Sequence, residues 1–378
     1  DLKFLYEVDS KIEGFGYQKD PRIKEIISKR DKRKDIVFAY GVNEDEIAFS
    51  KEEWEENKDR IKVYYGNLDL SNLTSAEGLV LPDIINGSLD LRGLTTAKGL
   101  VLPDTINGDL DLRGLTSVKN VKLPTAVNGN LNLGNLTSVE GLILPTTVNG
   151  NLDLPRLTNA EGLVLPNTIN GYIDLRNLKS AKGLVLPDII NGSLYLTSLT
   201  SAEGLVLPDT INEGLDLGSL TSAEDLALPD TINDNLDLGS LTSAEGLVLP
   251  NIIGGSLHLT SLTSAKGLVL PDTINGNLDL RGLTSVEGLV LPDTISGSLH
   301  LTSAKGLRLS NIIYGDLYLE GLTSVEGLVL PISLFNRVHS KITIPETCFI
   351  PDEEYYKYIN EEKNSYDNCS VKKYKMML

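Results

Sequence analysis

Apolar residues recur in a fixed pattern that fills most of the 378-residue chain. In the stretch LVLPDTINGDLDLRGL, residues 100–115, two pairs of leucines, each pair separated by one residue, stand ten positions apart. Near-copies follow with a 21-residue period, as the threonines at 95, 116 and 137 show, except for one 18-residue step at GSLHLTSAKGLRLS. About thirteen units result. A period of this length predicts a stacked solenoid in which each unit forms one turn.

The pattern within a unit predicts two short strands, at 110–112 and 100–102 and their equivalents, because apolar and other residues alternate there. Asn107-Gly108 and Gly99 predict turns. Pro103 is expected to end the strand at 100–102, since it has no N–H for a ladder. Parallel turns about 4.8 Å apart would give a rod on the order of 60 Å long. The residues expected to point inward are Leu89, Leu91, Leu94, Leu100, Leu102 and Ile106.

The two ends of the chain differ in composition from the repeats, and a solenoid needs caps over its terminal strand edges. We therefore expect a mainly β protein: a parallel β-solenoid at 65–331 with a small α/β cap at 1–64 and a C-terminal cap at 332–378. The elements predicted within the caps are a helix at 21–33, a strand at 36–40, a helix opened by the capping box at 50–53 and reaching about Lys58, a strand at 341–345, a helix at about 352–363 and a basic tail. An independent functional domain at 1–64 is the alternative.

The window Ala97-x-x-Leu100-x-Leu102-Pro103-x-x-Ile106 resembles the L-x-x-L-x-L-P-x-x-L core of bacterial leucine-rich repeats, especially the Treponema/BspA type. The resemblance covers residues 65–331, which is most of the chain. The 21-residue unit departs from that type in its length, in lacking the Ala-Phe and Cys positions, and in carrying a second Leu-x-Leu pair where the family is helical. This departure leaves open a flattened two-walled solenoid in place of a curved horseshoe. The family likeness implies a protein-binding or adhesive surface without catalysis.

One outward column varies while the rest of the repeat stays constant. The residue between the two leucines of 110–112 and its equivalents is expected to point away from the core, because side chains alternate along a strand. Four turns carry Asp there with Arg two residues later: Asp90 and Arg92, Asp111 and Arg113, Asp174 and Arg176, Asp279 and Arg281. Others carry Tyr195, His258, His300 and Tyr318. We predict that these residues form a partner-binding wall centred on the two histidines and Tyr318, since aromatics with a polar tip are common hot spots. A merely solubilising wall is the alternative.

A second column is apolar. The central residue of 100–102 and its equivalents is Val at 80, 101, 164, 185, 206, 248, 269, 290 and 329, with Lys122, Ile143, Ala227 and Arg308 in the other turns. If exposed, such a stripe would suit a homodimer or a docked partner. We expect that the neighbouring Thr/Ile column, with Ile84, Thr105 and Ile189, covers it.

Charge and composition narrow the classes of partner. The net charge is −18, and residues 64–331 hold 13 basic and 29 acidic side chains. Nucleic acid and anionic membranes are therefore disfavoured, whereas a basic protein would be attracted. No apolar run is long enough to span a membrane. The three histidines lack metal-ligand spacing, the calcium-binding nonapeptide is absent, and no catalytic motif occurs, so neither cofactor nor metal is expected.

These observations predict a non-enzymatic protein-binding or adhesion scaffold with a macromolecular, protein partner. Two alternatives stay open: a spacer or fibre module that self-associates through the valine stripe, and an enzyme in the end regions. The chain begins with Asp1, so a leader or a further domain can precede it. A secreted or cell-surface location is expected, and Cys348 and Cys369 can pair or stay free.

Overall fold

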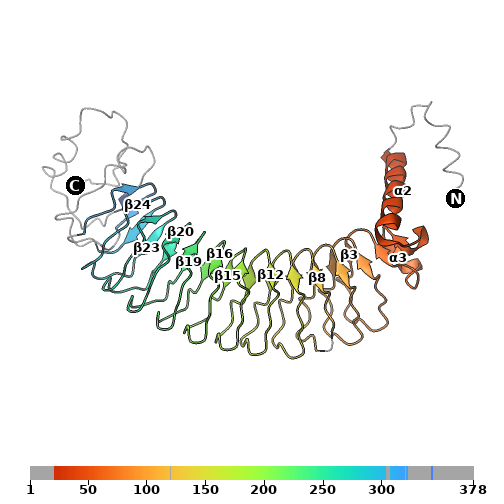
Figure 1. The fold of residues 1–378 in the computed structure, drawn as a ribbon, viewed down its shortest axis with the longest axis horizontal. Helices are drawn as coiled ribbons and strands as arrows, with labels where there is room; N and C mark the ends of the chain where they lie inside the picture. The colour runs from red at the N-terminus through yellow and green to blue at the C-terminus, as the bar shows by residue number, and fades with distance from the viewer. Residues whose placement is uncertain (1–20, 120, 304–306, 320, 322–341, 344–378) are drawn as a thin grey trace.

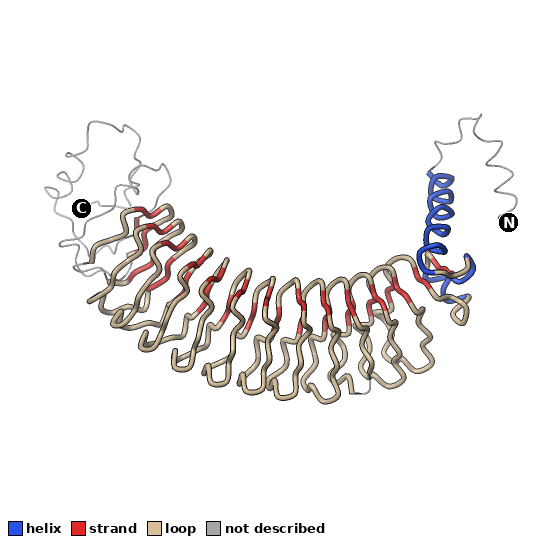
Figure 2. Tube along the Cα trace, viewed as in Figure 1, coloured by secondary structure: helices blue, strands red, loops and turns tan. Residues whose placement is uncertain are grey.

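The computed structural model describes the chain except for residues 1–20, 120, 304–306, 320, 322–341 and 344–378. The repeats stack as a parallel β-solenoid that bends into an arc (Figure 1). The strands lie toward the concave side of the arc, and the longer connections form its convex side (Figure 2). The predicted solenoid is confirmed, and its shape is the curved one of the two left open by the sequence.

Each turn contributes two strands to two columns of parallel strands. The first column is a 14-stranded sheet: β3 (Leu68–Asp69), β5 (Leu89–Asp90), β7 (Leu110–Asp111), β9 (Leu131–Asn132), β11 (Leu152–Asp153), β13 (Ile173–Asp174), β15 (Leu194–Tyr195), β17 (Leu215–Asp216), β19 (Leu236–Asp237), β21 (Leu257–His258), β23 (Leu278–Leu280), β25 (Leu299–Leu301), β27 (Leu317–Tyr318) and β28 (Ile342–Thr343). The thirteen strands from β3 to β27 span twelve complete turns.

The second column is divided into two 7-stranded sheets. The first comprises β1 (Ile47–Ala48), β2 (Val63–Tyr64), β4 (Ile84–Ile85), β6 (Thr105–Ile106), β8 (Ala126–Val127), β10 (Thr147–Val148) and β12 (Thr168–Ile169). The second comprises β14 (Ile189–Ile190), β16 (Thr210–Ile211), β18 (Thr231–Ile232), β20 (Ile252–Ile253), β22 (Thr273–Ile274), β24 (Thr294–Ile295) and β26 (Ile312–Ile313).

The second strand of each turn was predicted in the wrong place. It lies at Thr105–Ile106 and its equivalents, whereas 100–102 forms no strand. The segment follows directly on a turn in which Gly99 has φ +79° and the Leu100 N–H donates to the Ala97 carbonyl, and Pro103 ends it without an N–H. Regular pairing begins only after the proline; before it, the described residues of this column form one isolated bridge with one another, between Val164 and Val185.

The core follows the sequence prediction. Leu89, Leu91, Leu94 and Ile106 are completely buried, and the other inward positions are nearly so. The Asn-Gly bend between the two strands brings neighbouring turns into close backbone contact: a Cβ on Gly108 would lie 2.6 Å from the carbonyl carbon of Gly87. The stacking of the turns therefore favours glycine at this bend, although Glu213 and Asp234 stand at the equivalent position of two turns.

The 18-residue step leaves both strand columns in register. Across this step Leu299 of β25 pairs with Leu317 of β27, and Thr294 of β24 pairs with Ile312 of β26. In the turns from β3 to β25 the corresponding partners lie one full 21-residue period apart, as with Leu278 and Leu299. The three missing residues therefore come from a connection and not from a strand.

An asparagine ladder joins eight consecutive turns. In each step the side-chain Nδ2 of one asparagine donates to Oδ1 of the asparagine 21 residues earlier, at 2.8–3.4 Å. The ladder consists of Asn86, Asn107, Asn128, Asn149, Asn170, Asn191, Asn212 and Asn233. The step from Asn191 to Asn170 (2.8 Å) crosses the break between β12 and β14, where the second strand column is interrupted. Side chains thus bridge the two 7-stranded sheets.

The N-terminal cap contains more helix than predicted. Helix α2 runs over Pro21–Tyr40, so the strand expected at 36–40 is wrong. Ile36 is buried against Ile47 and Val63, while Phe38, which a strand would place on the same face, is 93% exposed. Packing on one helical face therefore overrides the β-branched character of this stretch.

The predicted second helix of the cap is confirmed but shorter. Helix α3 covers Lys51–Glu56, after the 3₁₀ turn η2 (Glu44–Glu46), and Ser50 Oγ accepts the N–H of Glu53 at 3.2 Å. In the C-terminal region, β28 (Ile342–Thr343) confirms a strand within 341–345. The helix at 352–363, the basic tail, His339, Val329 and both cysteines lie outside the described residues.

Candidate functional site

The varied column predicted to bind a partner runs along the 14-stranded sheet, on the face opposite the leucine core. We call it the aspartate column; its members are Asp69, Asp90, Asp111, Asn132, Asp153, Asp174, Tyr195, Asp216, Asp237, His258, Asp279, His300 and Tyr318. Each member pairs in register with the next along the ladder, as Asp174 does with Tyr195 and His300 with Tyr318. Neighbours are therefore about 4.8 Å apart.

Most of the polar members have a structural task inside their own turn. Asp111 Oδ1 accepts the backbone N–H of Arg113, two residues later, at 3.1 Å, which closes an Asx turn at the end of the strand. The same bond, at 2.8–3.2 Å, joins Asp69 to Ser71, Asp90 to Arg92, Asn132 to Gly134, Asp174 to Arg176, Asp216 to Gly218, Asp237 to Gly239 and Asp279 to Arg281. The recurrence of aspartate is thereby explained by the bend that ends each strand.

Four of these carboxylates also pair with the arginine of their own turn. The Nη2 of Arg176 lies 2.6 Å from Oδ2 of Asp174; Arg113 approaches Asp111 at the same distance, and Arg281 approaches Asp279 at 2.5 Å. Arg92 pairs with Asp90 in the same way, and its hydrogen bond lowers the pKa of that carboxyl. The ion pairs therefore follow the predicted spacing.

The exposure of these pairs differs from the prediction. Asp174 is 2% exposed, and Asp111 and Asp279 are also buried, so these aspartates do not present their carboxylates to solvent. The arginine side chains are about half exposed. Each of these guanidinium groups contacts both carboxylate oxygens of its aspartate, and it thereby shields the carboxylate from water. The guanidinium is therefore the accessible charge at these turns.

The predicted His/Tyr centre is brought together only in part. The rings of His300 and Tyr318 stack with their centroids 4.3 Å apart and their planes 11° apart. His258 lies two ladder steps from His300, with Asp279 between them. Tyr195 lies three steps before His258, in a different group.

A second group, around Tyr172, was missed by the sequence prediction. The Tyr172 hydroxyl donates to Oδ1 of Asp153 at 2.9 Å, and its ring packs edge-on against Tyr195 with the centroids 5.7 Å apart. Asp153 is available for this bond because the residue two positions later is Pro155, which has no N–H to close the Asx turn. Pro155 is the one proline at that position in the repeats, and this was the signal in the sequence.

The pKa values of both partners of this hydrogen bond, Asp153 and Tyr172, are raised. Burial holds the pKa of Asp153 above its usual range, although the Tyr172 hydrogen bond opposes the shift. Burial, together with the bond to Asp153, raises the pKa of Tyr172 to about 12. The phenol therefore stays protonated, and donates to the carboxylate, throughout the neutral range.

The expectation that the valine column is covered is wrong. Val101, Val206 and Val248 are each 74% exposed, and Val269 and Val290 more so. The Thr/Ile residues form the second strand of each turn, beyond the proline, and do not fold back over the valines; Ile189 and Ile252 are themselves more than half exposed. The solenoid therefore has a polar and an apolar surface column.

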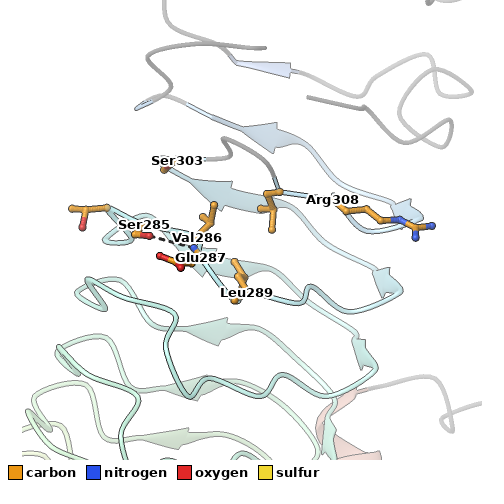
Figure 3. A pocket seen from close by; sticks show the side chains of 9 residues that line it. Ser285, Val286, Glu287, Leu289, Ser303 and Arg308 are labelled. Atoms are coloured by element: carbon orange, nitrogen blue, oxygen red, sulfur yellow. Dashed lines mark hydrogen bonds between the residues drawn. The ribbon is translucent and has the colours of Figure 1, made fainter. Parts of the chain in front are cut away.

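The short turn opens a hollow of about 660 Å³ beside Leu289 and Leu307. A buried leucine column, which includes Leu241, Leu262 and Leu283, has no member in the 18-residue step. Figure 3 shows Ser285 and Glu287 at the hollow joined by a hydrogen bond, and Arg308 extending away from them. Its polar side chains do not converge on a common point, so the hollow shows no arrangement for holding a ligand.

Within the described residues, no group of His, Cys, Asp and Glu side chains is arranged to hold a metal ion, and neither helix of the N-terminal cap is long and apolar enough to cross a membrane. Comparison with protein-family models, with curated proteins and with solved structures gave no match.

Proposed function

We propose that the chain is a non-catalytic, leucine-rich scaffold that binds a protein partner through the aspartate column. The observation that carries the proposal is the loss of the Asx residue at four turns, where Tyr195, His258, His300 and Tyr318 replace it. These substitutions lie on one face of one sheet, while the leucines beside them stay constant.

Fold stability alone does not account for these substitutions. A side chain that cannot accept the i+2 N–H forgoes a hydrogen bond that contributes about 0.5–1.5 kcal/mol. Ring stacking between His300 and Tyr318 offsets part of that loss. If these aromatic residues bind a partner, that role explains why the repeat keeps them in spite of the part of the lost hydrogen-bond energy that stacking does not offset.

The chemistry of the column suits protein recognition. Tyr and Arg are among the residue types most enriched in binding hot spots, and the column presents both, with the guanidinium groups of Arg92, Arg113, Arg176 and Arg281 about half exposed. The resemblance to bacterial leucine-rich repeats points in the same direction, and a secreted or cell-surface location suits an adhesive role.

The test restores the Asx residue without changing the formal charge at neutral pH. Asn132 shows that asparagine closes the turn, with the N–H of Gly134 at 2.9 Å. The variant Y195N/H258N/H300N/Y318N should therefore fold at least as well as the wild type and lose the partner. A matched control, T200N/T242N/T263N/T284N, changes four exposed threonines that lie outside the sheets.

Immobilised wild type, variant and control are exposed to the same extracellular protein fraction, and the retained proteins are quantified. We expect a protein that is held by wild type and control and lost by the variant; its affinity is then measured with purified components. If wild type and variant retain the same proteins to the same extent, the proposal is wrong.

A further inference from the structure

The valine column forms an extended exposed apolar stripe. Val185 is 67% exposed, Val206 and Val248 are 74% exposed, and each lies one or two turns from the next. A bridge between Val164 and Val185 shows that consecutive members face each other in parallel register. Extended apolar surface of this kind usually marks an interaction site.

Acidic side chains border this stripe on both sides. Val206 has the exposed Glu203 three positions before it and the exposed Asp209 three positions after it. Three positions before Val185, Val206, Ala227 and Val248 stand Lys182, Glu203, Glu224 and Glu245, and three positions after them stand Asp188, Asp209, Asp230 and Asn251, so both borders are acidic except at Lys182 and Asn251. Because the turns stack in register, each set forms its own column beside the valines.

The same region holds no basic side chain. Between Lys182 and Lys266 there is neither Lys nor Arg, although the stretch carries eleven carboxylates. They are Asp188, Glu203, Asp209, Glu213, Asp216, Glu224, Asp225, Asp230, Asp234, Asp237 and Glu245, and all are exposed or half-buried. Lys182, at the Val185 end of one border, is therefore the one basic side chain of the two borders of this part of the stripe.

One of these carboxylates stands where the backbone favours glycine. Asp225 has φ +61°, and it is the one non-glycine residue with positive φ among the described residues. The equivalent positions in the neighbouring turns are Gly204 and Gly246, with φ +75° and +78°. A left-handed conformation costs an L-residue about 1–2 kcal/mol, so backbone stability would favour glycine over aspartate at this position.

We propose that the stripe from Val185 to Val248 binds a cationic amphipathic segment of a partner protein, with the apolar face of that segment on the valines and its lysines or arginines against the two acidic borders. Charge complementarity selects this occupant. A second copy of the chain would bring acidic borders against acidic borders, and an anionic membrane would be repelled in the same way. This surface is distinct from the aspartate column, so either proposal can fail without the other.

The probe is an 18-residue amidated peptide with leucines at helical i, i+3, i+4, i+7 spacing and lysines at the remaining positions. Its binding to the full chain is followed by fluorescence anisotropy at low and moderate salt. Two control peptides carry Glu in place of Lys, or the same composition without amphipathic spacing. We expect binding of the first peptide alone, weakened but not abolished by salt.

Two charge-matched variants locate the site. V185K/V206K/V248K changes the stripe, and T200K/T221K/T242K adds the same charge at exposed threonines of the same region. The chain itself carries Lys122 and Arg308 in the valine column and Lys179 in the threonine column, so both variants should fold. The first should weaken peptide binding at least ~10-fold and the second less than ~3-fold.

Three outcomes would overturn the proposal. They are the absence of binding to the wild type, equal weakening by the two triple variants, and a wild-type dimer in sedimentation that the valine variant alone dissociates. The last would establish self-association through the stripe. The Asn variant of the aspartate column should bind the peptide as the wild type does, which separates the two surfaces.

Discussion

The hydroxyl of Tyr172 donates a 2.9 Å hydrogen bond to Asp153, a carboxylate of the preceding turn that has no Asx bond to make. The raised pKa of Asp153 means that the folded state binds a proton more tightly than the unfolded state. Its stabilising effect is therefore complete in acid and is lost as pH rises through the folded pKa. Asp153→Asn should remove this dependence, so that the variant gains in urea midpoint relative to wild type between pH 4 and neutrality.

The contribution of Asp90 to stability should depend on pH in the opposite direction, and Asp90 therefore serves as the control. Its pKa is lowered by the hydrogen bond from Arg92, so its contribution is present above the unfolded pKa and is lost as pH falls. Asp90→Asn should therefore lose urea midpoint relative to wild type near neutrality and approach it in acid. Equal pH profiles for the two variants would contradict both assignments.

Tyr172 should govern stability in alkali. Its pKa of about 12 exceeds the usual value near 10, so its contribution is intact below pH 10 and is lost as pH rises toward 12. Tyr172→Phe should flatten the fall in thermal midpoint over that interval. Tyr314→Phe, at an exposed tyrosine, is the control and should leave the slope as in wild type.

The Asx turn and the ion pair can be separated at Asp174. Asp174→Asn keeps an oxygen for the Arg176 N–H and loses the salt bridge, whose arginine is largely solvated. Asp174→Ala leaves that N–H without its acceptor. We expect a loss of less than about 1 kcal/mol for Asn and about 1–3 kcal/mol for Ala, measured by urea denaturation. If Asn costs as much as Ala, the ion pair and not the turn is the stabilising element.

Asn191 should couple the two halves of the solenoid. It donates to Asn170 across the gap between β12 and β14, whereas Asn128 makes the same bonds where β8 pairs on both sides. Since repeat arrays unfold through nearest-neighbour interfaces, Asn191→Ala should split unfolding into two steps. Fluorescence of Trp54, the single tryptophan, reports the N-terminal half, and circular dichroism reports the whole. Coincident transitions for Asn191→Ala, or split ones for Asn128→Ala, would contradict the prediction.

The short turn should become more stable when the leucine column is completed. Insertion of Ser-Leu-Thr between Thr302 and Ser303 recreates the sequence HLTSLTSA found at 258–265. Burial of the new leucine should add about 1.5–3 kcal/mol to stability. Insertion of Ser-Ser-Thr is the control of equal length and should not stabilise; an equal gain from both insertions would exclude leucine burial as the cause.

The period of the sequence carried the fold, because equivalent residues of successive units pair directly and the leucines at fixed offsets fill the core. The sequence period did not predict the position of the second strand of each turn. LVLP at 100–103 alternates better than TI at 105–106, but it lies between the left-handed turn at Gly99 and Pro103, which has no N–H to donate, and it forms no strand. Similarly, the strand-like stretch at 36–40 is helical because Ile36 finds its partners through α2.

The candidate site was predictable as a column and not as a set of contacts. The spacing of Asp174 and Arg176 gave their ion pair, but the burial of Asp174 depends on how the guanidinium lies over it. The bond between Tyr172 and Asp153 joins two turns and follows from Pro155, whose effect is visible only once the Asx turns of the other repeats are known.

The constancy of register has a consequence for how such a chain can change in length. Along the 14-stranded sheet from β3 to β27 each residue of one turn pairs with the equivalent residue of the next, and even the 18-residue step preserves both strand columns. A crossover between two repeats in their coding sequence therefore yields a product whose turns still align. Whole turns, together with the side chains they display, can be gained or lost as units, so the array is extensible without redesign of its core.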